Sequence, residues 1–262
     1  MKTIGSRDNP IYKKARKLLK RKYRDAYGLY LLEGIKPLRD AISLGIEIEK
    51  IFVCDGEMDI SAPKDSGYDF TILDRELFKM LTDTEHSQGV ISVVKKVKRS
   101  VDSLEEMKNC GSGNLVILDR LQDPGNVGTV IRTAEAAGYS GVVTVTGCAD
   151  VYSPKVVRAA AGSLFRVPVI DGGDQEMLIP ELKKYGFKIA ATSLDGDTLY
   201  RDADISESTA LVIGNEGNGV GNEFLEAADL KIKIPMEGSI ESLNAAVAAG
   251  ILMYQSQKIN FK

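Results

Sequence analysis

Residues 115–134 read LVILDRLQDPGNVGTVIRTA. The first four of them are large and apolar, which is typical of a buried strand. The pair Pro124 and Gly125 predicts a turn, and Asn126 is expected to cap a helix over Val127–Ala137. This strand-turn-helix unit predicts an α/β fold built on a parallel sheet.

The same alternation continues through residues 113–262. Buried strands are expected at Leu115–Leu118, Val142–Val145, Phe165–Val169, Lys188–Ala191, Ala210–Ile213 and Leu230–Ile234. Further helices are expected at Pro154–Ala161, Gln175–Tyr185, Gly221–Ala228 and Ser242–Gln257. The pattern predicts a mostly parallel sheet with helices on both faces. Of the 25 glycines, 18 lie in residues 111–262 and cluster at strand ends, where such sheets bind ligands.

Residues 1–94 predict a smaller α/β unit. Asn9 and Pro10 suit the start of a basic amphipathic helix over residues 10–22. Strands are expected at Tyr27–Leu32, Lys50–Cys54, Phe70–Leu73 and Val90–Val94, and helices at Lys36–Leu44 and Arg75–Leu81. Residues 95–112 are highly charged and end in Gly and Ser, which predicts a linker before the second domain at 113–262.

Composition limits the class of protein. The chain has 262 residues, 44% hydrophobic and 27% charged, which is typical of a globular protein and favours two domains. Three separated cysteines and the single histidine, His86, lack the ligands of a Cys/His zinc site, so we expect no catalytic metal. We expect His86 in a solvated or RNA-facing loop. The odd cysteine count, with neither a signal peptide nor a membrane span expected, indicates the cytoplasm.

Charge is distributed unevenly along the chain. Residues 1–24 hold ten Lys or Arg and one acid, a net +9, whereas the rest of the chain carries −12. Such a basic arm predicts contact with RNA phosphates, and a merely solvated charged face is the alternative. Tyr23, Tyr27 and Tyr30 are candidates to stack on bases, with some of them expected in the core.

Residues 211–221, LVIGNEGNGVG, place four glycines in eight positions after a strand. The glycines predict a close approach to a flat ligand, so Gly214→Val is expected to clash with that ligand and spare the fold. Glu216 at the centre of the loop favours a neutral or cationic ligand over phosphate. The loop does not match the G-x-G-x-x-G pattern, which disfavours a nicotinamide enzyme.

Residues 234–250, IPMEGSIESLNAAVAAG, place a glycine loop before an Ala-rich helix that begins at Ser242 or Asn244. The small side chains allow close packing of this helix. With a lone histidine and no G-x-S-x-G segment, a Ser-His-Asp hydrolase has no support.

Together and in this order, NVGTVIRTA at 126–134, VIGNEGNGV at 212–220 and residues 234–250 resemble the three motifs of the SpoU/TrmH family of RNA 2′-O-ribose methyltransferases, part of the SPOUT superfamily. LLEGIKPLRDAI at 31–42 and HSQGVISVV at 86–94 are similar to the ribosomal-protein-like RNA-binding domain often joined to such enzymes. The resemblance implies a deep trefoil knot and a homodimer formed through the C-terminal domain. It also implies methyl transfer from S-adenosylmethionine to a ribose 2′-hydroxyl of structured RNA. We expect ribosomal RNA, with transfer RNA or a catalytically silent RNA-binding protein as alternatives.

The resemblance also assigns roles to particular residues. The positions that match catalytic residues are Asn126, Arg132, Glu216, Ser242 and Asn244. The positions that match the S-adenosylmethionine site are Thr192, Leu194, Gly214, Ile234 and Leu243. We expect Arg132 to be partly exposed, to bind a substrate phosphate and to lower the pKa of the ribose hydroxyl. A structural ion pair and a role as the base are the alternatives for Arg132.

Overall fold

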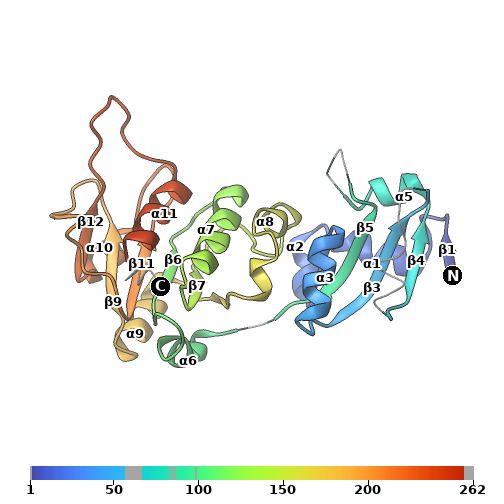
Figure 1. Ribbon diagram of the computed structural model, residues 1–262, viewed down its shortest axis with the longest axis horizontal. Coiled ribbons are helices and arrows are strands. Elements are labelled where there is room, and N and C mark those ends of the chain that lie inside the picture. Colours follow the sequence, from blue (N-terminus) through green and yellow to red (C-terminus); the bar gives the residue numbers. More distant parts are fainter. Residues whose placement is uncertain (1, 57–66, 83, 85–86, 98, 257–262) are drawn as a thin grey trace, which may run out of the picture. The chain divides into compact units, whose positions relative to one another are not determined.

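The structure, a computed structural model, describes residues 2–56, 67–82, 84, 87–97 and 99–256; His86 lies outside the described residues. It divides into two compact units (Figure 1). Unit 1 comprises Met1–Val97 with Asp150–Phe165, and unit 2 comprises Lys98–Ala149 with Arg166–Lys262. Among the described helices, none has the length and apolar character needed to cross a membrane.

Unit 1 has a mixed five-stranded sheet in the order β1-β4-β3-β5-β2. The strands are β1 (Lys2–Ile4), β2 (Leu29–Glu33), β3 (Ile48–Cys54), β4 (Phe70–Leu73) and β5 (Val90–Lys95). Alternate residues of one strand enter different cores: Phe52 packs in one hydrophobic cluster, and its neighbours Ile51 and Val53 pack in the other. Both faces of the sheet are therefore covered.

The helices of unit 1 are α1 (Pro10–Lys17), α2 (Arg21–Tyr27), α3 (Ile35–Ser43), α5 (Arg75–Lys79), α8 (Pro154–Ala159) and the 3₁₀ turn η2 (Ser163–Phe165). Helices α1 and α5 supply side chains to one core cluster, and α3 and α8 supply the other. Asn9 caps α1 as predicted, since its side chain accepts a hydrogen bond from the Ile11 backbone at 2.9 Å.

The single basic helix expected over residues 10–22 is wrong in its extent. The chain turns after α1 and begins α2, which also replaces the predicted start of a strand at Tyr27. Arg24 is the physical reason, because its side chain is buried and donates to the Leu18 carbonyl at 2.7 Å. That bond holds α2 against the end of α1. Gly28, with φ +65°, then ends α2 before β2.

Asp150–Phe165 lies between two strands of unit 2 in the sequence but packs in unit 1. Arg24 donates to Asp150 Oδ2 at 2.6 and 2.8 Å, and Val157 of α8 is buried in the cluster that contains Leu38. The domain boundary expected at residue 113 would place Asp150–Phe165 in the second domain, whereas in the structure this segment belongs to unit 1. The strand predicted at Phe165–Val169 is also wrong, because η2 ends at Phe165 and the strand begins at Val169.

Unit 2 has a seven-stranded sheet in the order β10-β12-β9-β11-β6-β7-β8, and every pair in it is parallel, as predicted. Its strands are β6 (Leu115–Leu118), β7 (Gly141–Thr144), β8 (Val169–Asp171), β9 (Lys188–Thr192), β10 (Thr198–Leu199), β11 (Thr209–Ile213) and β12 (Leu230–Lys233). Strands β12, β9, β11 and β6 are consecutive neighbours. Their carboxyl ends therefore meet at one edge of the sheet.

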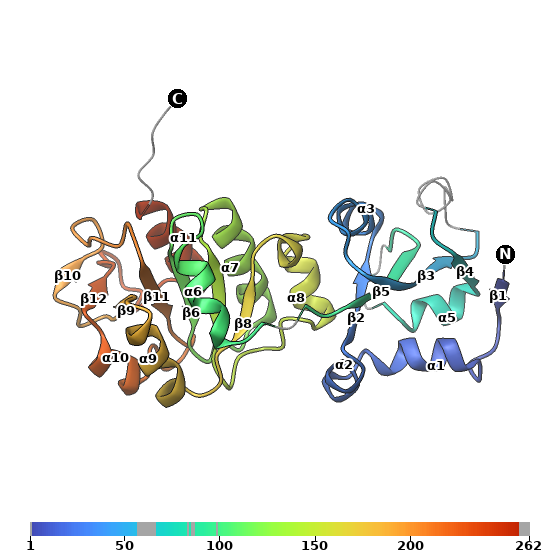
Figure 2. The same cartoon turned by 90° about the horizontal axis from the view of Figure 1, so that it is seen from below.

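Helices cover both faces of this sheet. They are α6 (Leu104–Lys108), α7 (Pro124–Ala136), α9 (Gln175–Lys184), α10 (Asn222–Ala227) and α11 (Ala245–Gln255), with a 3₁₀ turn η1 (Val101–Ser103). Figure 2 shows α7 and α11 on one side of the sheet and α9 and α10 on the other. Helices α7 and α11 pack against each other. The trefoil knot stays a prediction.

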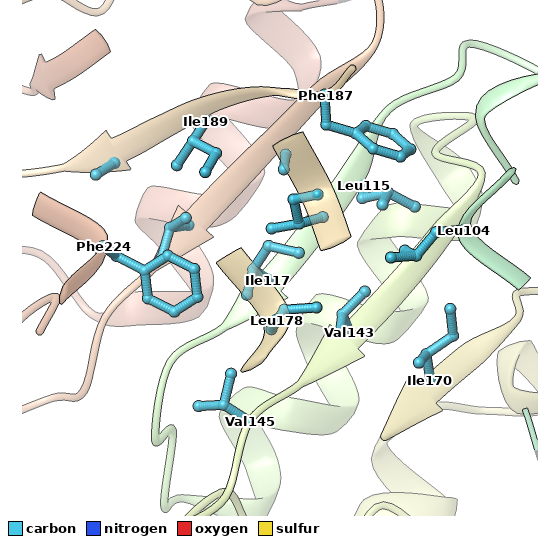
Figure 3. Close-up of a cluster of buried hydrophobic side chains, with 14 of the residues drawn as sticks. Leu104, Leu115, Ile117, Val143, Val145, Ile170, Leu178, Phe187, Ile189 and Phe224 are labelled. Carbon is cyan, nitrogen blue, oxygen red and sulfur yellow. The ribbon is translucent and has the colours of Figure 1, made fainter. Parts of the chain in front are cut away.

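A core cluster fills the space between the sheet and α6, α9 and α10 (Figure 3). It joins Ile117 of β6 and Ile189 of β9 to Leu178 of α9 and Phe224 of α10. Leu104 of α6 belongs to the same cluster. The segment 95–112, predicted to be a linker, thus contains a helix that contributes to the core of unit 2.

Candidate active site

Asn126 lies in the first turn of α7, directly after the loop that follows β6. Asp123, not Asn126, is the N-cap, because its Oδ1 accepts a hydrogen bond from the Asn126 backbone N–H at 2.8 Å. The expectation that Asn126 caps this helix is therefore wrong. Freed from capping, the buried Asn126 amide is available for contacts with other segments.

Glu216 lies in the loop after β11 and binds the loop after β6. Its Oε1 accepts from Asn126 Nδ2 at 3.0 Å and from the Asp123 backbone at 3.1 Å, and its Oε2 accepts from the Gln122 backbone at 3.3 Å. Partial burial raises the pKa of Glu216, but the hydrogen bonds from Asn126 and the backbone outweigh it and hold the pKa below its ordinary value. Because protein donors occupy both oxygens, this carboxylate does not by itself indicate a cationic ligand.

Asn244 connects the third motif to the first. Its Nδ2 donates to Asn126 Oδ1 at 2.9 Å, and its Oδ1 accepts from the backbones of Ala246 and Val247 at 3.0 and 3.3 Å. It is therefore the N-cap of α11, as predicted, and also a partner of Asn126. A chain of hydrogen bonds joins Glu216, Asn126 and Asn244, so the structure brings together one residue from each motif.

Arg132 lies six residues after Asn126 on α7, about 9 Å along the helix axis. Its side chain is exposed, more so than expected, and it makes no hydrogen bond or ion pair with another residue in the described part of the chain. The structural ion pair considered as an alternative is thus absent from those residues. Ser242, two residues before Asn244, is also exposed, and among the described residues its side chain makes no hydrogen bond to Asn126, Glu216 or Asn244.

The five residues expected to hold a cofactor lie at the ends of adjacent strands or just before α11. Thr192 ends β9, Gly214 follows β11, and Ile234 follows β12. Leu194 is 56% exposed in the loop after β9, and Leu243 is half-buried. The parallel register of β12, β9 and β11 therefore places Thr192, Gly214 and Ile234 along one edge.

Gly214 is required by the protein's own backbone. A Cβ added to it would lie 2.2 Å from the Gly219 carbonyl carbon and 2.3 Å from the Val220 nitrogen. The loop folds back here, with backbone hydrogen bonds between Asn215 and Gly219 in both directions at 3.0 Å. The expectation that Gly214→Val spares the fold is therefore wrong, and that substitution does not test ligand binding.

Three polar residues at this edge did not emerge from the sequence. Asp119 is fully buried, Arg120 has a positive φ of 56°, and Asn215 donates from Nδ2 to the Arg120 carbonyl at 2.9 Å. An acid directly after four buried apolar residues was the available signal for Asp119. No feature of the sequence predicts the positive φ of Arg120.

Comparison with known proteins identifies the families that the two parts of the chain match. Residues 113–254 match the SpoU rRNA methylase family, and residues 9–92 match an MRM3-like substrate-binding domain. The chain belongs to the SpoU rRNA methylase family. One SpoU relative, the 23S rRNA (guanosine(2553)-2′-O)-methyltransferase RlmP of Bacillus subtilis, is 37% identical over 254 residues, which are 97% of this chain and 98% of the relative.

Two solved structures extend the SpoU likeness to the whole fold. An S-adenosylmethionine-bound rRNA methyltransferase from Sinorhizobium meliloti has a TM-score of 0.86 and 31% identity, with 97% of each chain covered. The SpoU methyltransferase AviRb from Streptomyces viridochromogenes, in complex with S-adenosylmethionine, has a TM-score of 0.84 and 29% identity, covering 95% of this chain and 97% of AviRb. The predicted family and α/β fold are thus confirmed.

Proposed function

We propose that this protein transfers a methyl group from S-adenosylmethionine to the 2′-hydroxyl of a ribose in ribosomal RNA. The observation that carries the proposal is the hydrogen-bonded chain of Glu216, Asn126 and Asn244, which joins the three family motifs at one sheet edge. The B. subtilis relative is named for a guanosine of 23S rRNA, so the corresponding guanosine of this organism's 23S rRNA is the first target to examine.

The side chains and backbone groups at the sheet edge fit S-adenosylmethionine. Leu194 and Ile240 are large apolar side chains that are 56% and 58% exposed, and they suit contact with a flat apolar ring. Polar contacts would come from backbone groups at Gly214 and Ile234, since the Thr192 hydroxyl already donates to the Val212 carbonyl at 3.1 Å. The chemistry supplied by bound S-adenosylmethionine is a methyl group activated by a sulfonium.

Arg132 is the residue we assign to the RNA backbone. Its exposed guanidinium has no partner among the described residues and can donate two aligned hydrogen bonds to a phosphate. A guanidinium stays protonated in proteins, which favours binding of phosphate over acting as a base. Ser242 has an exposed hydroxyl and is assigned to the ribose.

The basic surface of unit 1 is assigned to the rest of the RNA. Tyr27 is 39% exposed and its ring centroid lies 5.9 Å from that of Tyr23, with Lys17 above Tyr23 at 5.3 Å. These two rings are suited to stack on bases. Tyr30 is buried against Tyr152, and Arg24 is buried in its ion pair with Asp150, so neither belongs to the RNA surface.

A homodimer and a cytoplasmic location complete the proposal. Helix α11, AAVAAGILMYQ, has no charged residue and only Gln255 as a polar amide, yet Val247 and Tyr254 remain 52% and 47% exposed. Exposed apolar side chains on such a helix support contact with a second copy of unit 2.

The function is tested by mapping 2′-O-methyl groups in RNA from cells with and without the gene. Purified protein with labelled S-adenosylmethionine should then restore one methyl group on rRNA from the deletion strain. Binding of S-adenosylmethionine and RNA without transfer would instead indicate the silent RNA-binding alternative. Methylation of transfer RNA alone would overturn the ribosomal assignment.

A further inference from the structure

Asp119 holds a fully buried carboxylate at the carboxyl end of β6. Its Oδ1 accepts from Gln175 Nε2 at 2.6 Å and from Arg120 Nε at 3.0 Å. Its Oδ2 accepts from the Gly221 backbone at 2.7 Å and from Arg120 Nη2 at 3.1 Å. Burying a charge costs free energy unless it is paired and hydrogen-bonded, and these four bonds meet that requirement.

Arg120 adopts a backbone conformation that residues other than glycine rarely adopt. Its φ is 56°, and a residue other than glycine in this region carries a conformational cost. In this conformation its guanidinium binds the preceding Asp119, and its carbonyl oxygen accepts a hydrogen bond from Asn215 Nδ2 at 2.9 Å. One residue thus contacts both the buried acid and the loop after β11.

These bonds fix both ends of the loop 215–221. Asn215 at its start is held by Arg120, and Gly221 at its end is held by Asp119. Asn215 Oδ1 also accepts from the backbones of Gly217 and Asn218 at 3.0 and 3.1 Å. Glu216 lies between the two fixed ends, so its position depends on them.

We propose that Asp119 and Arg120 are positioning residues for methyl transfer, acting by holding the loop 215–221 so that Glu216 fixes Asn126. This inference rests on the proposed methyltransferase function. Neither residue is assigned a contact with substrate or cofactor. The four hydrogen bonds to Asp119 and the backbone conformation of Arg120 instead hold the loop 215–221 in place against the loop after β6.

Two substitutions weaken the hold on the loop 215–221. Arg120→Gly keeps the positive φ at no steric cost and keeps the carbonyl that binds Asn215, but it removes the guanidinium and with it two of the four bonds to the Asp119 carboxylate. Asn215→Ala removes the bond to the Arg120 carbonyl. Asp119→Asn is the direct change, but it endangers folding. Asp171→Asn, at the exposed end of β8, is the control for loss of an acid at the carboxyl end of a strand.

Each full-length variant is measured in two ways: the single-turnover rate at saturating S-adenosylmethionine and RNA, and the pKa of Glu216 from its side-chain carbon NMR signal. We expect Arg120→Gly and Asn215→Ala to lower the rate about 10- to 100-fold with unchanged RNA affinity. In both variants the pKa of Glu216 should rise toward its ordinary value. Asp171→Asn should change neither quantity.

Both effects are required together. A lower melting temperature with an unchanged rate per folded molecule would make the two residues merely structural and overturn the proposal. A change in only one of the two quantities would overturn it as well, because the action is proposed to run through Glu216. A wild-type chain that methylates no RNA would overturn the proposed function, and the NMR titration would still decide whether Asp119 and Arg120 hold Glu216.

Discussion

Arg132 differs from Asn126, Glu216 and Asn244 in that its side chain binds no other residue in the described part of the chain. The polar side-chain atoms of the other three form hydrogen bonds with one another and with the backbone. These bonds fix the relative positions of the three side chains and leave few polar groups to bind substrate. Its exposed guanidinium, on the same helix as Asn126, is the group that can respond to RNA.

Arg132→Lys should lower the single-turnover rate of methyl transfer about 100-fold, because lysine keeps the charge but loses the planar fork. Affinity for S-adenosylmethionine, measured by calorimetry, should stay at the wild-type value. Arg201→Lys, another exposed arginine of unit 2, is the control and should react at the wild-type rate. Wild-type rates in both Arg132→Lys and Arg132→Ala would remove Arg132 from the mechanism.

The three cysteines should react very differently with alkylating agents. Burial raises the pKa of the Cys148 thiol to about 11, so at pH 8 only about one molecule in a thousand carries the thiolate there. Cys110 is exposed and Cys54 is buried. Iodoacetamide at pH 8, followed by mass spectrometry, should label Cys110 first, and labelling of Cys148 should accelerate as the pH rises toward 11. Equal rates at Cys110 and Cys148 would contradict this placement.

At the scale of elements, the residue pattern predicted regular segments well and junctions poorly. Apolar runs such as Leu115–Leu118 specify buried strands directly, and β6 has those bounds. The turn between α1 and α2 was missed because it depends on the buried Arg24 side chain, which binds the Leu18 carbonyl and also Asp150, a partner 126 positions away. Likewise, the motif residues could be chosen from the sequence, but the bonds that Asp119 makes to Gln175 and Gly221 depend on the fold.

Helix α1 and the turn that follows it should carry much of the salt dependence of RNA binding. Deleting residues 1–24 is a poor test, because it removes β1 and the buried Tyr12 and Leu18. The triple change Arg16→Gln, Lys17→Gln and Lys20→Gln removes only exposed charges that form no ion pair with described residues. It should flatten the slope of log affinity against log salt by about two units through reduced counterion release.

The control for that measurement is Lys183→Gln combined with Lys231→Gln, two exposed lysines of unit 2. This pair should leave the slope closer to that of the wild type. A triple variant with an unchanged slope would show that the basic helix is only solvated.

At the scale of the whole molecule, the proposed homodimer makes a direct prediction about mass. Tyr254→Glu places a charge on the exposed apolar part of α11 and should convert a particle of twice the chain mass into a monomer, as measured by sedimentation. Met177→Glu is the matched control, since Met177 is 72% exposed on α9. A wild-type protein that sediments as a monomer would rule out the dimer.

The placement of Asp150–Phe165 has a consequence for how such proteins can be recombined. The chain passes between the units three times, near residue 98 and on both sides of this segment. A single proteolytic cut near residue 98 therefore cannot release unit 1 whole, and a single genetic crossover there would separate Arg24 from its native partner Asp150. An RNA-binding domain borrowed from another enzyme would have to bring a surface that accepts this segment, or bring the segment with it.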